Sequence, residues 1–307
     1  MTSSAILAHY DPDGLAAPYV LRLLDQLGDC FDQILIPTTA RLTDDARAAL
    51  AHRGSVIERE NVGQDFGGWQ EALRDHVRID RLDHLLLTND TYVGFLRPLA
   101  SIIEAMSRRQ VEYWGITENL QVARHIQSFF VMANEPLLRS KVWSRFWGEF
   151  AVQERRDDVI VQHEVGMSQA FYAAGFDAAP YFQPTSEEVA LAGEREMWRR
   201  SRMAELDPDL PTRATYQTNY TYSLADAALT DGRLPLVKIE VLRYDPGFLG
   251  DGVLLELCEE RFPDEFAGVR DYLARTAPAY LPRAGENPGG AVLPDAVGDR
   301  LRYRRDL

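Results

Sequence analysis

The sequence has very little lysine and cysteine. Lys141 and Lys238 are the only lysines, so arginine carries nearly all of the positive charge. The chain has 47 acidic and 33 basic residues and a net charge of −14, which excludes the broad basic face that a protein needs to bind duplex nucleic acid. Cys30 and Cys258 are too few and too far apart to form a disulfide framework or a zinc site. We therefore expect a protein of a reducing compartment that has no nucleic-acid partner.

Long apolar runs are also missing. No run approaches the length of a membrane-spanning helix. The opening Met-Thr-Ser-Ser leads directly into a strand-like segment, without the basic and apolar regions of a signal peptide. This pattern predicts a cytoplasmic protein and leaves open a peripheral contact with the inner face of the cell membrane. The length of 307 residues and the hydrophobic content of 46% are those of an ordinary globular protein.

The sequence does contain an alternation of short apolar strands and amphipathic helices. The expected strands lie at 5–8, 33–36, 54–57, 85–87, 111–116 and 129–132, and the expected helices at 15–27, 43–52, 69–77 and 99–106. Their order and short connections predict a doubly wound α/β domain, which we place at residues 1–185. A polar helix and further helical segments predict a helical C-terminal appendage over 186–280. Residues 281–307 are rich in Pro, Gly and Arg and predict a loose tail.

The expected strand at 85–87 is followed by small polar residues that include Asn89 and Asp90. Ligands of open α/β sheets bind beyond the carboxyl ends of the strands. A carboxylate such as Asp90 at that position can hold a hard divalent cation through oxygen. The alternative is that Asp90 only caps a helix or begins a turn.

A glycine-rich segment follows the third expected strand and contains Arg59, Asn61 and Asp65. Its backbone can approach a ligand closely, and the amides of the next helix can face an anion. A plain connection between a strand and a helix is the alternative. The spacing fits neither the dinucleotide fingerprint nor a phosphate-binding loop with its lysine, so we set those two enzyme classes aside.

Three polar residues, His125, Gln127 and Ser128, stand directly before an apolar run. They can therefore line the same rim as Asp90, although a hydrogen-bonded core histidine is the alternative for His125. Glu164 is expected near the start of a helix. It serves there either as a general base or only as a favourable charge at the helix dipole.

Taken together, these motifs resemble the rhamnan synthesis protein F family of bacterial polysaccharide biosynthesis. The resemblance rests on the segments 9–11, 59–69, 86–94, 114–117, 125–130, 164–176, 219–221 and 234–246. It extends over roughly residues 5–280. The family implies a GT-A-like (Rossmann-like) nucleotide-sugar-binding domain and a glycosyltransferase that typically uses dTDP-L-rhamnose.

The resemblance also implies roles for single residues. The nucleotide sugar would be bound by His9, Tyr10, Asp11, Arg59, Asn61, Asp65, Asn89, Asp90, Trp114, His125 and Gln127. The first three would meet the base and ribose, and the next three the nucleotide or diphosphate. Asp90 stands where GT-A enzymes carry their metal-binding Asp-X-Asp element and would hold Mg²⁺ or Mn²⁺, although this sequence has one carboxylate there rather than two. Glu164 occupies the place of the base in inverting GT-A enzymes.

The resemblance thus predicts an inverting hexosyltransferase. It would transfer L-rhamnose to a glycan or lipid-linked glycan acceptor during synthesis of a cell-surface polysaccharide such as O-antigen or capsule. Glu164 would take the proton of the acceptor hydroxyl in a single displacement. Two other classes stay open: a glycoside hydrolase with two carboxylates, and a non-catalytic carbohydrate-binding or scaffold module of the same fold.

Overall fold

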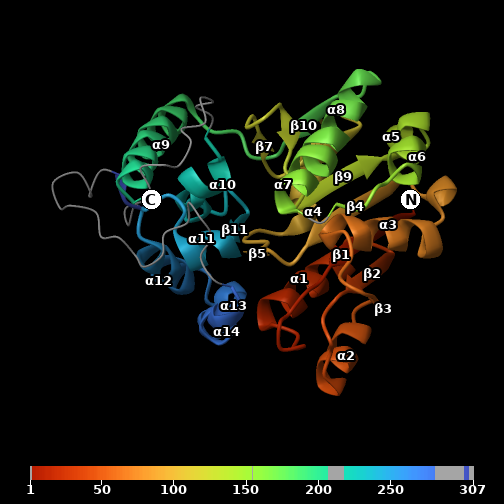
Figure 1. Ribbon diagram of the computed structural model, residues 1–307, viewed down its shortest axis with the longest axis horizontal. Coiled ribbons are helices and arrows are strands. Elements are labelled where there is room, and N and C mark those ends of the chain that lie inside the picture. The colour runs from red at the N-terminus through yellow and green to blue at the C-terminus, as the bar shows by residue number, and fades with distance from the viewer. Residues whose placement is uncertain (1, 154, 207–217, 281–300, 304–307) are drawn as a thin grey trace. The chain divides into compact units, whose positions relative to one another are not determined.

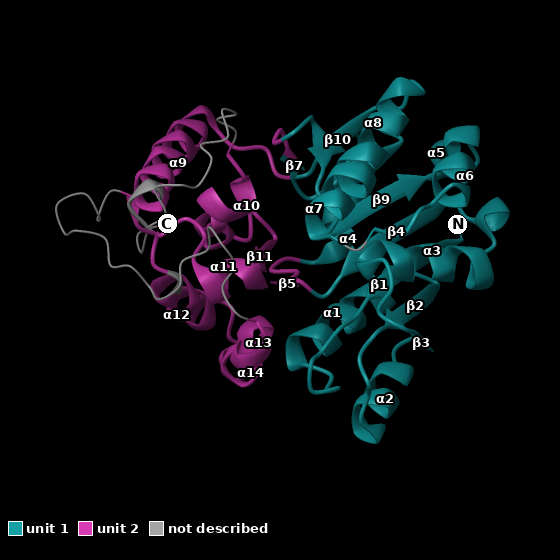
Figure 2. Ribbon diagram, in the orientation of Figure 1, with its two compact units in different colours: residues 1–90, 98–118, 122–181 teal, residues 91–97, 119–121, 182–307 magenta. Residues whose placement is uncertain are grey.

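The computed structural model describes most of the chain (Figure 1). The described residues are 2–153, 155–206, 218–280 and 301–303. They belong to two compact units, which Figure 2 shows in different colours. Unit 1 comprises residues 1–90, 98–118 and 122–181, and unit 2 comprises residues 91–97, 119–121 and 182–307. Two short inner segments of the sequence therefore belong with the C-terminal part of the chain.

A central sheet forms the core of unit 1 and confirms the α/β fold class (Figure 1). Its strands are β1 (Ser3–Ala8), β2 (Gln33–Thr38), β3 (Ser55–Glu58), β4 (His84–Asn89), β6 (Tyr113–Gly115), β9 (Phe130–Asn134) and β10 (Ala178–Pro180). They lie in the order β10-β6-β9-β4-β1-β2-β3. Strand β9 is antiparallel to β4 and β6, and the other neighbours are parallel. Leu85, Leu86 and Leu87 of β4 are completely buried, as expected for a strand that is covered on both faces.

Helices and short strands connect the strands of this sheet. They are α1 (Pro18–Gly28), α2 (Asp44–Ala51), α3 (Gln64–His76), η1 (Ile79–Arg81), α4 (Leu99–Ser107), β7 (Glu118–Asn119), β8 (His125–Ile126), α5 (Glu135–Leu138), α6 (Lys141–Gly148), α7 (Arg156–Val159), η2 (Ile160–Val165) and α8 (Gly166–Ala173). Local sequence explains where several of them begin. Pro18 opens α1, where the missing N–H is not needed. The Thr43 hydroxyl accepts a hydrogen bond from the Ala46 N–H at 3.3 Å and caps α2.

The glycine-rich connection between β3 and α3 is shorter than the sequence predicts. Helix α3 already begins at Gln64, directly after Gly63, whose φ is +76°. Gly67 and Gly68 therefore lie inside the helix. A Cβ at Gly67 would overlap the carbonyl oxygen of Val62. The glycines within α3 thus permit close packing and are not part of an open loop around a ligand.

Glu164 is also placed differently from the expectation. Helices α7, η2 and α8 follow one another without a break, and η2 is a π-helical turn. Glu164 lies near the end of η2, inside the continuous helical stretch, and not in a first turn. A favourable charge at a helix N-terminus therefore does not explain this residue. Single π-helical turns inside α-helices occur frequently at functional sites.

Unit 2 is mainly helical. Its elements are β5 (Tyr92–Gly94), α9 (Ser186–Leu206), α10 (Tyr220–Ser223), η3 (Ala225–Ala228), β11 (Leu236–Lys238), α11 (Ile239–Tyr244), α12 (Asp251–Arg261), α13 (Pro263–Phe266), α14 (Val269–Thr276) and η4 (Ala277–Ala279). Strand β5 pairs antiparallel with β11. Among the described residues, no helix has the length and apolar character needed to cross a membrane.

Residues 301–303 correct the expectation of a loose tail at that point. Arg195 of α9 is only 1% exposed and forms an ion pair with Asp226 at 2.7 Å. Its guanidinium also donates to two backbone carbonyls of 301–303, at 2.8 and 2.9 Å. The side of helix α9 that carries Arg195 is therefore covered by other residues of unit 2. The other parts of the expected tail, 281–300 and 304–307, lie outside the described residues.

Candidate functional site

Most of the expected site residues follow strands that end at one edge of the unit 1 sheet. Strands β1, β2, β3, β4 and β6 point the same way, and β9 runs in the opposite direction, so its first residues lie at the same edge. The strand order reverses beside β1, which has β2 on one side and β4 on the other. Ligands of open α/β sheets bind at such a switch point. Residues 9–11 and 89–90, which follow or end β1 and β4, are therefore placed where a ligand is expected.

Asp90 joins the two strands at this switch point. Its Oδ2 accepts a hydrogen bond from the Tyr10 N–H at 2.8 Å, and its backbone carbonyl accepts one from the Tyr19 hydroxyl at 2.9 Å. Burial, together with the negative charges of Asp65 and Asp11, raises the pKa of Asp90 to about 8 despite the hydrogen bond from Tyr10. Repulsion among carboxylates is relieved by a positive charge. The electrostatics of this edge thus favour a bound cation.

The residues at the switch point fit a divalent cation in part. Asp90 and Asp65 offer carboxylate oxygens, and the Asn89 side-chain N–H donates to Asp65 Oδ2 at 2.7 Å, which fixes α3 beside β4. Among the residues that the structure describes, no group of three or more His, Cys, Asp or Glu side chains is arranged to hold a metal ion by itself. Phosphate oxygens and water would have to complete the coordination, as is usual for Mg²⁺.

The segment after β1 contains one accessible and two buried side chains. His9 is buried, and its Nδ1 lies 2.9 Å from the Thr38 hydroxyl. Burial lowers the pKa of His9 to about 4, so its ring is neutral at pH 7. The Asp11 carboxylate accepts hydrogen bonds from two backbone N–H groups of the following turn, at 2.9 and 3.2 Å, and so shapes that turn. Tyr10 is 42% exposed, so its side chain is accessible, and its contact with a nucleotide stays a prediction.

Arg59 has partners within its own segment. Its Nε donates to Glu71 at 2.9 Å, and its Nη2 donates to the carbonyl oxygen of Val62 at 2.8 Å. The side chain is only 8% exposed. These contacts hold the connection before α3 in place. The Nη1 of Arg59 is buried and makes no hydrogen bond to the residues that the structure describes, and its contact with a diphosphate stays a prediction. Asn61, in contrast, is exposed, and its contact with the donor stays a prediction.

Glu164 lies in a second polar cluster, which also contains His125 and Ser128. Its Oε2 accepts hydrogen bonds from the Ser128 N–H, at 3.0 Å, and from the Ser128 hydroxyl. Its Oε1 lies 3.2 Å from His125 Nε2. Burial alone raises the pKa of Glu164, but the hydrogen bond and charge of His125 and the two bonds from Ser128 outweigh it and hold the pKa below its ordinary value. Glu164 is therefore ionised at neutral pH, and it remains 17% exposed.

The register of the sheet brings this cluster to the same edge as Asp90. Strands β4 and β9 are antiparallel, and Thr88 pairs with Phe130. Asp90 therefore follows the end of β4, and Ser128 precedes the start of β9, at the same edge of the sheet. Because Ser128 binds Glu164, the switch point and the Glu164 cluster share one edge of the sheet. Ser128 belongs to the cluster through its backbone as well as its side chain, and its position before an apolar run was the only sequence signal for it.

Trp114 and Gln127 contribute to packing. Trp114 is 3% exposed, and its ring lies 5.2 Å from that of Phe130. Gln127 is buried, and its Oε1 accepts a hydrogen bond from the Thr117 hydroxyl at 2.7 Å. Both side chains are occupied inside unit 1, so their contact with a nucleotide sugar stays a prediction. Tyr19 is a residue that sequence reasoning missed, because nothing in its local pattern distinguishes it from other apolar positions of α1.

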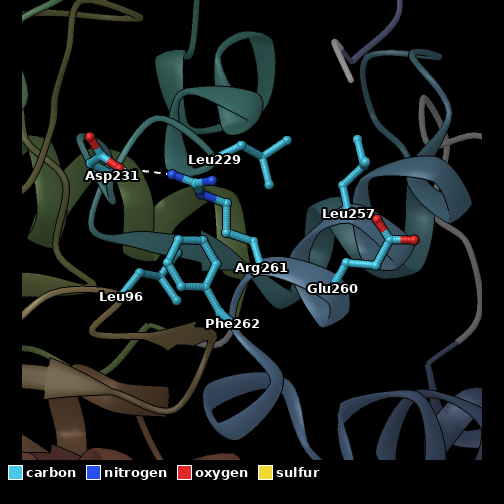
Figure 3. A pocket seen from close by; sticks show the side chains of 7 residues that line it. All are labelled: Leu96, Leu229, Asp231, Leu257, Glu260, Arg261 and Phe262. Atoms are coloured by element: carbon cyan, nitrogen blue, oxygen red, sulfur yellow. Dashed lines mark hydrogen bonds and ion pairs between the residues drawn. The ribbon is translucent and has the colours of Figure 1, made fainter. Parts of the chain in front are cut away.

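An open pocket of about 700 Å³ lies elsewhere, in unit 2 (Figure 3). Four apolar side chains and three charged ones line it: Leu96, Leu229, Leu257, Phe262, Asp231, Glu260 and Arg261. Figure 3 shows Arg261 directed at Asp231, with which it forms an ion pair at 2.8 Å. None of the residues expected to bind a nucleotide sugar lines this pocket. The candidate site is therefore the edge of the unit 1 sheet.

A comparison with protein families decides the relationship of this chain. The sequence profile described as rhamnan synthesis protein F matches residues 34–198, which is more than half of the 307 residues. The chain belongs to the rhamnan synthesis protein F family. The resemblance noted in the sequence is thereby confirmed. The matched region contains Asp90 and the Glu164 cluster, whereas β1 and residues 9–11 precede it.

The chain also matches individual proteins at low identity or over a short length. The chain is 24% identical over 185 residues to the uncharacterized protein y4gN of Sinorhizobium fredii, covering 59% of this chain and 48% of that protein. It is 39% identical over 77 residues to virulence protein VirA of Vibrio anguillarum, covering 24% of this chain and 23% of that protein. The chain thus spans about half or less of the length of these relatives.

Two solved structures show a weak likeness. One is 4-diphosphocytidyl-2C-methyl-D-erythritol synthase of Anaerococcus prevotii, at 10% identity and a TM-score of 0.37, covering 58% of this chain and 87% of that one. The other is glucosyl-3-phosphoglycerate synthase of Mycobacterium tuberculosis, at 12% identity and a TM-score of 0.33, covering 57% and 81%. At these scores neither likeness bears on the function of this member of the family.

Proposed function

We propose that this chain is an inverting glycosyltransferase of the GT-A type that transfers L-rhamnose from dTDP-L-rhamnose to a glycan or lipid-linked glycan acceptor. Membership of a family described by rhamnan synthesis supports a role in making a polysaccharide. The structural observation that carries the proposal is the shared sheet edge. The carboxylates of Asp90 and Glu164 belong to two polar clusters, and the pairing of β4 with β9 puts the strand ends that carry these clusters at that edge.

The donor would bind at the switch point between β1 and β4. Tyr10 offers an exposed side chain for the base, and a cation would offset the negative charges of Asp65 and Asp11 beside Asp90. Asp90, with Asp65 nearby, would hold Mg²⁺ or Mn²⁺ through oxygen. When bound, the ion neutralises charge on the leaving diphosphate, which is commonly the largest contribution to catalysis in such reactions.

The acceptor would be activated by Glu164. A carboxylate offers about four lone pairs, and three hydrogen bonds from His125 and Ser128 occupy most of them. A position on Oε1 is left for the hydroxyl of an acceptor. The hydroxyl oxygen attacks the anomeric carbon as its proton passes to Glu164, and the bond to the diphosphate breaks with its electron pair on the leaving oxygen. A single displacement of this kind inverts the anomeric centre.

The variant Glu164→Gln tests this assignment. It keeps the size and the hydrogen bonds from Ser128 but removes the base, so we expect kcat to fall by about 10²-fold or more while donor binding changes little. Transfer from dTDP-L-rhamnose gives kcat, and a thermal shift with the same donor reports binding. Glu149→Gln, which changes an exposed carboxylate at the end of α6, is the matched control. Equal turnover of Glu164→Gln and the control would remove the assignment.

The donor is tested by a thermal-shift screen of nucleotide sugars with and without Mn²⁺. A ligand present at 100 times its Kd stabilises the native state by about 2.7 kcal/mol, so the preferred donor should give the largest shift. A larger shift with another nucleotide sugar would replace rhamnose in the proposal. Cleavage of intact glycans without any donor would favour the hydrolase alternative, and glycan binding without donor turnover would favour a binding module.

A further inference from the structure

His125 has a hydrogen-bonding arrangement that determines where its protons lie. Its Nδ1 is 2.7 Å from the carbonyl oxygen of Ala123. A carbonyl oxygen only accepts hydrogen bonds, so Nδ1 must carry a proton and donate it. A neutral ring would then have a bare lone pair on its second nitrogen, Nε2.

That second nitrogen faces a carboxylate. His125 Nε2 lies 3.2 Å from Glu164 Oε1, and His125 is 2% exposed. A lone pair of nitrogen against an ionised carboxylate oxygen is repulsive in so buried a place. The contact is favourable only if a proton lies between the two atoms, on the histidine or on the carboxylate.

The surroundings decide between those two positions. Ser128 directs both its N–H and its hydroxyl at Glu164 Oε2, and these donors favour the ionised carboxylate. The other acidic group that faces His125 is Glu118, which is paired with Arg124 at 2.9 Å. Burial on its own lowers the pKa of His125, but Glu164 and the other partners outweigh it and raise the pKa above the ordinary 6.5. The proton therefore belongs to the histidine.

We propose that His125 is a positioning residue that acts through Glu164: it carries a proton on both ring nitrogens and holds the carboxylate ionised and aimed at the acceptor hydroxyl. The part played in sugar transfer rests on the proposed function, whereas the protonation of the ring does not. During transfer, the proton of the acceptor goes to Glu164 and later to water. His125 keeps both of its protons throughout.

The protonation state is measured on the full chain without any ligand, by NMR of ¹⁵N-labelled histidine rings as the pH is varied. We expect His125 to titrate above pH 6.5 and to be doubly protonated at pH 6.5. In Glu164→Gln the midpoint should fall, because the negative partner is gone. His163 is the internal control, since burial lowers its pKa, and it should titrate below 6.5 in both proteins. A His125 midpoint at or below 6.5 in the unmodified protein would overturn the proposal.

The consequence for transfer is measured with His125→Gln, whose side-chain amide still reaches Oε1 as a donor but carries no charge. The loss of an opposite charge should raise the pKa of Glu164, so the acidic limb of the profile of kcat/KM against pH should move upward by about one pH unit or more. His125→Ala offers no hydrogen-bond donor to Glu164, so its kcat/KM should also be reduced at pH values above the acidic limb. If His125→Gln is as active as the unmodified protein and has the same profile of kcat/KM against pH, the role of His125 is only structural and the proposal is wrong.

The two kinds of failure are distinguishable. A protein that transfers no sugar from dTDP-L-rhamnose, or from any other donor in the screen, contradicts the proposed function alone. The ring titration of His125 still decides whether the ion pair exists. A neutral His125 in an active transferase contradicts the inference alone.

Discussion

Removing the charge of Asp90 should stabilise the metal-free protein at high pH. The pKa of Asp90 in the folded chain is about 8, because of burial and the neighbouring negative charges of Asp65 and Asp11, whereas an unfolded chain has an aspartate pKa of about 3.9. Between these two values the folded protein holds a proton that the unfolded chain has released. The free energy of unfolding therefore falls as the pH rises from about 4 to about 8. Asparagine does not ionise, so the Asp90→Asn protein does not lose stability in this way.

The size of the effect follows from the difference between the two pKa values. The two pKa values differ by about four, and each pKa unit corresponds to about 1.36 kcal/mol, so the loss of unfolding free energy is at most about 6 kcal/mol. Asp90 is partly exposed, so solvent screens much of the repulsion. We expect Asp90→Asn to gain about 1–3 kcal/mol over the unmodified protein between pH 5 and pH 9. The amide oxygen of Asn can still accept the Tyr10 hydrogen bond, so the difference at pH 5 should be only the small part that develops between about pH 4 and pH 5.

Urea denaturation with a chelator present, at pH 5 and at pH 9, measures this difference. Asp32→Asn is the control. Hydrogen bonds from the backbone and hydroxyl of Ser3 lower the pKa of Asp32, so Asp32 is ionised in both the folded and the unfolded chain at pH 5 and at pH 9. The change in unfolding free energy caused by Asp32→Asn should therefore be the same at both pH values. The same effect of Asp90→Asn at pH 5 and pH 9 would refute the reasoning. Addition of Mn²⁺ at pH 9 should raise the Tm of the unmodified protein and not that of Asp90→Asn.

Two further predictions concern stability, each measured by chemical denaturation against a matched control. Asp226→Ala strands the buried guanidinium of Arg195 and should cost about 3–5 kcal/mol, whereas Glu104→Ala breaks an exposed ion pair with Arg108 at the end of α4 and should cost less than about 1 kcal/mol. Gly67→Ala places a Cβ against a backbone carbonyl before α3 and should cost about 1–3 kcal/mol, whereas Gly148→Ala meets open space and should not destabilise. Equal costs within either pair would contradict the packing described for it.

Several features of the fold could be predicted from local sequence. The buried leucines of β4 and the helical spacing of apolar residues in α1 are local patterns, and they predict the elements directly. The polar residues after β1 and β4 lie at the switch point of the sheet, and their role in binding a ligand stays a prediction. The limits of α3 were wrong, because Gly67 was interpreted as part of a loop when it permits close packing within a helix.

The candidate site itself was only partly predictable. Sequence reasoning placed Glu164 in the first turn of a helix, but it lies inside a π-helical turn, and the pattern of side chains alone does not distinguish the two. The partners of Glu164 depend on where β8 and β9 pack, so Ser128 and His125 could be suggested but not paired. The Nε of Arg59 is paired with Glu71, a contact that sequence spacing does not reveal, and the contact of Arg59 with the donor stays a prediction.

The amino-acid sequence by itself therefore determined the α/β class, the family and the polar strand ends, because these depend on short-range periodicity and on residue types. The tertiary structure decided that β9 enters the sheet antiparallel beside β4 and so brings the segment that holds Glu164 to the edge where Asp90 stands. It also decided the charge states, since the pKa of Asp90 and that of Glu164 move in opposite directions from similar starting values. Both outcomes depend on which distant segments become neighbours and how far they exclude water.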